Sequence, residues 1–267
     1  MNIAISKATT SDLPLLKALQ PAGWGDIMPN MIFYTGSDFC YLVKAVVDDN
    51  IVGCGAVIIH GNCAWLANII VHETYRGKGA GTAITSHLLH YAGAKRGSII
   101  LIATKFGYPV YKKLGFTDDE EYTFFSGAEI ETRHDERILP YAEPFKDAVF
   151  TIDREVTGES REQLLTPKLS DAFVYVNNGL VEGFTIPSLG EGLTLAYNNH
   201  AGIALMNKSL AGKTRIALPK PNTAAIDHAL LLKLKPLADL YAIKMYKGKR
   251  IEWKPGQTFG RVGGNMG

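Results

Sequence analysis

The feature that most constrains this chain is a strand, a glycine-rich turn and a helix that follow one another between Ile69 and about Ala92. An apolar β-branched run, Ile69–Val71, predicts the end of a strand, and apolar residues at helical spacing after Thr82 predict a helix. The first N–H groups of a helix have no partner inside it, and the helix dipole adds partial positive charge there. This arrangement predicts that the main chain binds a phosphate group.

The turn itself carries the sequence Arg76-Gly77-Lys78-Gly79-Ala80-Gly81-Thr82. Its three glycines have no Cβ, so a pyrophosphate can approach the main chain closely. Arg76 and Lys78 add full positive charges that can form charge-assisted hydrogen bonds. The alternative interpretation is a flexible surface turn without a ligand.

Three kinds of phosphate loop can be compared with this turn. A P-loop requires Ser or Thr directly after its Gly-Lys pair, and Lys78 is followed by Gly79. A dinucleotide-binding loop requires a third glycine where Thr82 stands, and it follows its strand directly. The pattern Arg/Gln-x-x-Gly-x-Gly/Ala is matched in full by Arg76, Gly79 and Gly81. In this loop the chain resembles the GCN5-related N-acetyltransferase (GNAT) superfamily, whose loop holds the pyrophosphate of coenzyme A.

A second segment carries the same resemblance. Residues 98–104 predict a buried strand, and residues 106–114 predict a short helix that ends at Gly115. The run from Tyr111 to Phe116 is similar to the Tyr-x-x-hydrophobic-Gly-Phe signature of the GNAT superfamily. The resemblance implies that Tyr111 protonates the departing thiolate of coenzyme A, which suits a phenol because it keeps its proton until a strong base is near. The alternative for Tyr111 is a half-buried packing residue.

The order of predicted elements over residues 2–126 is β-α-α-β-β-β-α-β-α-β. This is the order of the GNAT acyl-CoA N-acyltransferase fold, an α/β (α+β) fold with a mixed, mostly antiparallel sheet flanked by helices. In that family the fourth and fifth strands splay apart, and the fourth strand pairs with the pantetheine arm. The resemblance therefore implies that the coenzyme contacts come from Ile69, Ile70, Val71, Arg76, Gly77, Lys78, Gly79, Ala80, Gly81 and Thr82.

The second half of the chain echoes the first. Its hairpin turn Asn177-Asn178-Gly179 corresponds to Asp48-Asp49-Asn50, and a helix is predicted after residue 200. This half resembles a degenerate, smaller GNAT-like domain, as in two-domain bacterial members. The predicted organisation is an N-terminal acetyltransferase domain (1–126), a polar, Pro-containing linker (127–146) and a C-terminal domain (147–267).

The second half lacks the glycine-loop motif, so one coenzyme site per chain is expected. In its place stand Asn198, Asn199 and His200, which are interpreted as turn and cap residues, with substrate contact as the alternative. A last strand is predicted at residues 240–245. The glycine-containing tail from Phe259 is expected to be a frayed or docking end.

Composition excludes several functional classes. The net charge is +2, with 28 Lys and Arg against 26 Asp and Glu, which argues against nucleic acid as a main partner. Cys40, Cys54 and Cys63 match no zinc spacing, so no metal site is expected and buried thiols of a cytoplasmic protein are predicted. No apolar run is long enough to span a membrane. A monomer or homodimer is expected.

The function implied is an acetyl-CoA-dependent N-acetyltransferase that transfers an acetyl group to the primary amine of a small molecule by direct attack. Tyr111 is the general acid, and the N–H of Ile70 or Val71 is the partner of the thioester carbonyl. Two alternatives stay open: a non-catalytic acyl-CoA-binding sensor, and an acetyltransferase for a protein lysine or N-terminus.

The general base of this reaction is left open. Asn68 on the predicted fourth strand cannot accept a proton. The candidates are Asp26, His72 and Glu73, or no dedicated base at all. Trp24 and Tyr34 either line an acceptor pocket or pack a surface helix, and helix packing is preferred.

Overall fold

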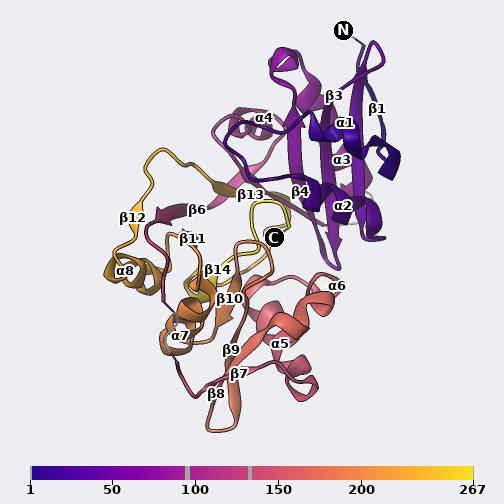
Figure 1. The fold of residues 1–267 in the computed structure, drawn as a ribbon. Helices are drawn as coiled ribbons and strands as arrows, with labels where there is room; N and C mark the ends of the chain where they lie inside the picture. The colour runs from indigo at the N-terminus through magenta and orange to yellow at the C-terminus, as the bar shows by residue number, and fades with distance from the viewer. Residues whose placement is uncertain (1, 94–96, 132–133, 267) are drawn as a thin grey trace. The chain divides into compact units, whose positions relative to one another are not determined.

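The structure is a computed structural model that describes residues 2–93, 97–131 and 134–266. The chain forms two compact units (Figure 1). The first unit contains Met1–Ile102, Phe106–Thr117 and Met245–Arg250, and the second contains Ala103–Lys105, Asp118–Lys244 and Ile251–Gly267. No helix among the described residues is both long and apolar enough to cross a membrane.

The first unit is built on a mixed sheet with the strand order β1-β2-β3-β4-β5-β13. Strands β1 to β4 pair antiparallel, and β4 pairs with β5 in parallel. The strands are β1 (Ala4–Lys7), β2 (Cys40–Val47), β3 (Asn50–His60), β4 (Cys63–Val71), β5 (Ser98–Ala103) and β13 (Ile243–Gly248, of which Met245–Gly248 lie in this unit). The helices are η1 (Thr10–Asp12), α1 (Leu13–Lys17), α2 (Met28–Gly36), η2 (Glu73–Tyr75), α3 (Ala80–Gly93) and α4 (Tyr108–Lys113).

Helix α3 packs closely on β3 because two strand residues have no side chain. A Cβ built on Gly55 would lie 2.6 Å from Ile84 Cγ2, and one on Gly53 would lie 2.9 Å from Ile84 Cδ1. The first turn of α3 then lies against the end of β4, since a Cβ on Gly81 would be 3.7 Å from Val71 Cγ2. Close helix–sheet packing therefore determines where the helix N-terminus lies.

The second unit contains a five-stranded antiparallel sheet with the order β14-β10-β9-β8-β7, and β6 pairs antiparallel with β11 and β12. The strands are β6 (Thr117–Ser126, from Asp118 onward in this unit), β7 (Ile138–Pro140), β8 (Phe173–Asn177), β9 (Leu180–Ile186), β10 (Leu193–Ala196), β11 (Arg215–Pro219), β12 (Lys235–Pro236) and β14 (Thr258–Gly260). The helices are η3 (Glu143–Phe145), α5 (Lys146–Thr157), α6 (Glu162–Leu165), η4 (Thr166–Asp171), α7 (Asn199–Leu210), α8 (Thr223–Leu231) and η5 (Pro255–Gln257).

The predicted fold class, a mixed and mostly antiparallel sheet flanked by helices and followed by a second α+β unit, is confirmed. Both predicted hairpin turns are two-residue turns with positive φ at each position: 47° and 62° at Asp48 and Asp49, and 48° and 78° at Asn178 and Gly179. These are the angles of turns that match the twist of a hairpin.

Some predicted elements differ from the observed ones in the second half of the chain. The predicted linker contains β7, in which Ile138 pairs with Tyr175. The last predicted strand, residues 240–245, lies instead at Ile243–Gly248. Of the two predicted states of the tail, frayed or docked, the structure shows the docked one: Phe259 is fully buried and β14 pairs with β10. Each difference involves pairing with a strand distant in sequence. The predicted domain boundaries, 1–126, 127–146 and 147–267, stay a prediction.

Candidate functional site

Strands β4 and β5 separate part-way along their length. Their parallel pairing ends at Trp65 and Ile100, while β4 continues to Val71 and β5 to Ala103. Beyond this point the β4 edge that faces β5 is unpaired among the described residues. An unpaired strand edge presents main-chain N–H and C=O groups that another extended chain can bind.

A β-bulge interrupts β4 at the start of this open edge. Ala56 pairs with Ala67 and Cys54 with Ile70, so Asn68 and Ile69 together face the single residue Gly55. Asn68 has a φ of 44°, in the left-handed region. The extra residue in this bulge and the left-handed conformation of Asn68 determine which later residues of β4 face the open edge.

Hydrogen bonds show the direction of each main-chain group after the bulge. The N–H of His72 donates to Val52 on β3 at 2.8 Å, and Ile70, two residues earlier in β4, lies opposite Cys54 on β3. Because main-chain groups alternate along a strand, Ile70 faces β3, whereas Ile69 and Val71 face the open edge. In agreement, the carbonyl of Val71 accepts a hydrogen bond from Arg76 Nε at 3.1 Å.

The glycine loop that follows adopts a conformation that few other residues can reach. Gly77 and Gly79 have φ angles of 72° and 92°, and a Cβ built on either would meet no heavy atom within 4 Å. Glycine is therefore required for backbone geometry, and the space above the loop is open. Helix α3 starts at Ala80, earlier than predicted, because Gly79 C=O accepts the N–H of Ala83 at 2.9 Å.

The N–H groups of Ala80, Gly81 and Thr82 form the first turn of α3, and none of them donates a hydrogen bond to any other residue that the structure describes. Two cations stand beside them. Arg76 is exposed and tethered through Nε, and Lys78 lies 5.5 Å from the centre of the Tyr75 ring. Free N–H groups, a helix dipole and two cations are the features that favour an anion at the start of a helix.

The segment from Tyr111 to Phe116 forms a Schellman motif at the end of α4. The N–H of Phe116 donates to Tyr111 C=O at 3.0 Å, the N–H of Gly115 donates to Lys112 C=O at 3.1 Å, and Gly115 has a φ of 82°. The rings of Tyr111 and Phe116 make the accompanying apolar contact, with centroids 5.8 Å apart. Local helix-ending chemistry alone therefore explains the spacing of Tyr111, Gly115 and Phe116.

The hydroxyl of Tyr111 is not explained by helix ending. The residue is 8% exposed, and burial raises the pKa of its hydroxyl to about 12. No hydrogen-bond partner for this hydroxyl is found within the described part of the chain. Gly107 leaves room for the ring, because a Cβ there would lie 2.7 Å from Tyr111 Cε2. A largely buried phenol that keeps its proton, and whose hydroxyl pairs with none of the described residues, is suited to donate that proton to a group that becomes basic beside it.

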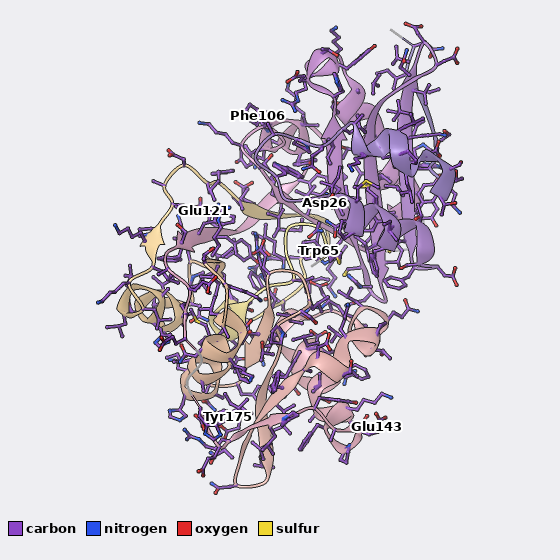
Figure 2. The ribbon with its side chains drawn as sticks, viewed as in Figure 1. Asp26, Trp65, Phe106, Glu121, Glu143 and Tyr175 are labelled. Atoms are coloured by element: carbon purple, nitrogen blue, oxygen red, sulfur yellow. The ribbon has the colours of Figure 1, made fainter. Side chains whose placement is uncertain are left out.

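The candidate bases lie at or near the surface. Asp26 Oδ1 accepts the N–H of Met28 at 3.0 Å at the start of α2 (Figure 2), and His72 Nδ1 lies 2.9 Å from Thr74 Oγ1. Glu73 is exposed in η2. None of these contacts distinguishes a base. Tyr34 is buried and pairs with Asn68, so it packs inside the unit as preferred, whereas Trp24 is 45% exposed.

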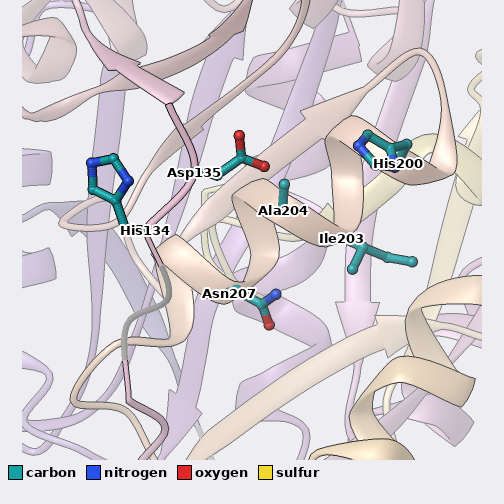
Figure 3. Close-up of a pocket in the computed structure, with 6 residues that line it drawn as sticks. All are labelled: His134, Asp135, His200, Ile203, Ala204 and Asn207. Carbon is teal, nitrogen blue, oxygen red and sulfur yellow. The ribbon is translucent and has the colours of Figure 1, made fainter. Parts of the chain in front are cut away.

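A separate pocket lies in the second unit over one face of α7 (Figure 3). Two of its polar groups are already paired: Arg137 Nε donates to Asp135 Oδ1 at 2.9 Å, and Asn207 Oδ1 lies 2.7 Å from His228 Nε2. The side chain of Asn198 caps α7 by accepting the N–H of Ala201, as predicted for a cap residue. The pocket is lined by His134, Asp135, His200, Ile203, Ala204 and Asn207.

Residues 13–116 match the family model described as "Acetyltransferase (GNAT) family". The match begins at α1 and ends at Phe116, so it includes the open β4 edge, the glycine loop and Tyr111. The chain contains a GNAT acetyltransferase domain. It is therefore an acyltransferase of the N-acetyltransferase type, and acetyl-CoA, the acyl donor of the GNAT family, is its co-substrate.

Solved structures similar to the whole chain extend the likeness to both units. A provisionally named acetyltransferase from Pyrococcus horikoshii is 22% identical with a TM-score of 0.84, covering 99% of this chain and 96% of that one. A GCN5-related N-acetyltransferase from Sphaerobacter thermophilus is 12% identical with a TM-score of 0.64, covering 95% and 98%. A tandem GNAT protein from the clavulanic acid biosynthesis pathway is 10% identical with a TM-score of 0.62, covering 92% and 98%. At these identities the likeness shows the fold. No curated protein matches the sequence.

Proposed function

We propose that this protein transfers the acetyl group of acetyl-CoA to the primary amine of a small molecule by direct attack, with Tyr111 as the general acid. The observation that carries the proposal is the open edge of β4 that leads directly into a glycine loop with free N–H groups. One coenzyme site per chain is proposed, in the first unit.

The residues of this corner fit the parts of the coenzyme. The N–H groups of Ala80, Gly81 and Thr82 would bind the pyrophosphate over the open space at Gly77 and Gly79, with Arg76 and Lys78 supplying charge. The main chain of Ile69 and Val71 would pair with the pantetheine arm. Ile70, the third predicted strand residue, faces β3, which narrows the proposed contacts of the strand main chain to its two neighbours.

The proposed reaction needs a partner for the carbonyl oxygen and a proton for the sulfur. A neutral amine attacks the thioester carbonyl carbon, the C–S bond breaks, and the sulfur leaves with the electron pair. A main-chain N–H at the open edge, that of Val71 or Ile69, would stabilise charge on the carbonyl oxygen. Tyr111 would give its proton to the sulfur, which suits a phenol whose pKa burial raises to about 12. The proton that the amine loses goes to solvent or to a base still to be found.

Calorimetric titration with acetyl-CoA tests the site. Wild type should bind about one equivalent per chain, and an Arg76→Ala, Gly79→Ala double variant should lose roughly 100-fold in affinity, because charge-assisted contacts are each worth about 1.5–3 kcal/mol. The matched control is Arg215→Ala, Gly212→Ala, since Gly212 also has a positive φ (69°) and open space around it. Absence of binding by wild type, or equal binding by the loop variant, would contradict the proposal.

Replacement of Tyr111 by Phe tests the general acid. Turnover measured by release of free thiol should fall by about 10²- to 10⁴-fold while acetyl-CoA affinity persists. Tyr108→Phe, on the same helix, is the control and should keep its turnover. Unchanged turnover in Tyr111→Phe would show that another group protonates the thiolate. A wild type that binds acetyl-CoA but turns over no amine or peptide would indicate the sensor instead.

A further inference from the structure

A buried hydrogen bond joins helix α2 to the bulge of β4. Tyr34 Oη donates to Asn68 Oδ1 at 2.7 Å, and the two residues are 2% and 8% exposed. A buried hydroxyl–amide bond of this length is well formed, and loss of the Tyr34 hydroxyl would remove this partner from the buried side-chain oxygen of Asn68. The bond therefore holds the side chain of the bulge residue in one place.

Asn68 needs to be held, because its backbone is in an unfavourable region. Its φ of 44° is left-handed, a region that is unfavourable for a residue with a Cβ, although Asn tolerates it better than most. A second contact comes from β3, where Cys54 Sγ lies 3.8 Å from the Asn68 carbonyl oxygen. Burial raises the pKa of the Cys54 thiol to about 12, so it stays a neutral donor.

The conformation of Asn68 has a consequence further along β4. Main-chain direction alternates with every residue, so one extra residue in the strand exchanges the groups that face β3 with those that face the open edge. With the bulge in place, Ile69 and Val71 face the open edge. Without it, Ile70 would face that edge instead, or the end of β4 would lose its pairing with β3.

We infer that Tyr34 and Asn68 are positioning residues that hold the β4 bulge and thereby aim the N–H groups of Ile69 and Val71 at the thioester carbonyl. This inference rests on the proposed function. Neither side chain takes part in a bond-making step. Their effect appears where the carbonyl is recognised, and the pyrophosphate loop, which begins at Arg76, does not depend on them.

This separation gives the inference a distinctive readout. Coenzyme A without an acetyl group uses the loop and the pantetheine contacts, whereas acetyl-CoA also uses the carbonyl contact. The ratio of the two dissociation constants therefore reports how well the N–H groups are aimed. Loss of an interaction made mainly in the transition state lowers kcat more than it raises the dissociation constant.

The experiment compares Tyr34→Phe with Tyr41→Phe. The control removes a hydroxyl of the same unit that lies 3.3 Å from His87 Nε2 of α3. Tyr34→Phe should lower kcat by about 10- to 100-fold and reduce the preference for acetyl-CoA over coenzyme A, because acetyl-CoA loses the carbonyl contact in addition to any pantetheine contact that both ligands lose. Amide hydrogen exchange at Ile69 and Val71 should become faster in Tyr34→Phe and not in the control.

Asn68→Gly keeps the inference testable if Tyr34→Phe fails to fold, because it removes the side chain that Tyr34 holds without adding strain in the left-handed region. It should show the same altered ratio, and the Tyr34→Phe, Asn68→Gly double variant should be no worse than either single one. The inference is overturned if Tyr34→Phe behaves like Tyr41→Phe, or if it only unfolds more easily with kcat and the ratio intact. A wild type that binds no coenzyme overturns both this inference and the proposed function. Normal wild-type binding with an unchanged ratio in the variants overturns the inference alone.

Discussion

Each of the two units contains a corner at which a strand leads through a short turn into a helix: β4 into α3 in the first unit, and β10 into α7 in the second. The two corners differ in which groups hydrogen-bond to their main-chain N–H and C=O groups. In the first unit, β4 leaves an open edge and the first turn of α3 has free N–H groups. In the second unit, β14 pairs with β10, with Thr194 opposite Gly260, and Asn198 caps the first turn of α7. The same framework can hold a phosphate ligand only where the chain leaves these groups unsatisfied.

The space beside each helix start differs in the same sense. A Cβ built on Gly77 or Gly79 would meet nothing, whereas one on Gly202 in α7 would lie 2.1 Å from the Phe259 ring. Phe259 is fully buried and belongs to β14. In the second unit the C-terminal segment of the chain therefore packs against the first turns of α7, whereas the glycine loop before α3 has open space around it. This difference agrees with the proposal of one coenzyme site per chain.

The largest expected effect is the loss of stability when the buried Phe259 ring is removed from the second unit. Phe259→Ala should lower the free energy of unfolding by about 3–5 kcal/mol, because it removes a buried aromatic side chain and leaves a cavity. Chemical denaturation monitored by circular dichroism measures the loss. Phe106→Ala is the control, since Phe106 is 87% exposed (Figure 2) and its removal should change stability little.

Titration of Phe259→Ala with acetyl-CoA, under conditions where it is folded, completes this test. The stoichiometry should stay at about one per chain, because the second corner also lacks the glycine loop and its cations. A second binding event in this variant would show that Phe259 alone blocks a functional second site.

A matched pair of glycine substitutions should show that one corner is needed for stability and the other for acetyl-CoA binding. Gly202→Ala should lower the free energy of unfolding by about 1–3 kcal/mol through overpacking against Phe259, with acetyl-CoA affinity unchanged. Gly79→Ala should cost about 1–2 kcal/mol of stability because of its positive φ, and should weaken binding about 10-fold. Thermal unfolding and calorimetry on both proteins measure the two effects. The comparison fails if Gly202→Ala weakens binding as much as Gly79→Ala.

The smallest effect concerns pH. In the first unit the helix after β5 carries Tyr111. In the second unit no tyrosine directly follows β11, since the next residues are Lys220, Pro221 and Asn222. Burial raises the pKa of Tyr111 from 10.0 to about 12, so the stability it contributes is complete below pH 10 and is lost as pH rises through 12. At pH 11 the raised pKa of Tyr111 should have lowered the free energy of unfolding by about 1 kcal/mol relative to its value below pH 10. The fall in unfolding free energy between pH 9 and 11 should be smaller in Tyr111→Phe than in wild type, and equal slopes would mean that Tyr111 titrates as if exposed.

Local chemistry explains why much of the first unit could be predicted. The turn at Asp48 and Asp49, the loop with Gly77 and Gly79, and the helix end at Gly115 each depend on backbone angles that only a few residue types adopt. Their positions were correct, and helix α3 differed only in beginning at Ala80. The bulge at Asn68 carried a weaker signal, since a lone Asn in an apolar strand gives no indication that Tyr34, far away in sequence, pairs with it.

The sequence alone determined the fold class, the glycine loop, the Tyr111 helix end and the absence of that loop from the second half. Tertiary structure decided what no local pattern encodes: that Met245–Gly248 join the sheet of the first unit, that β7 pairs with β8, and that β14 covers β10. The physical reason is that turns and caps are specified by the conformational limits of single residues, whereas strand pairing is specified by whichever edge remains available once the rest of the chain has packed.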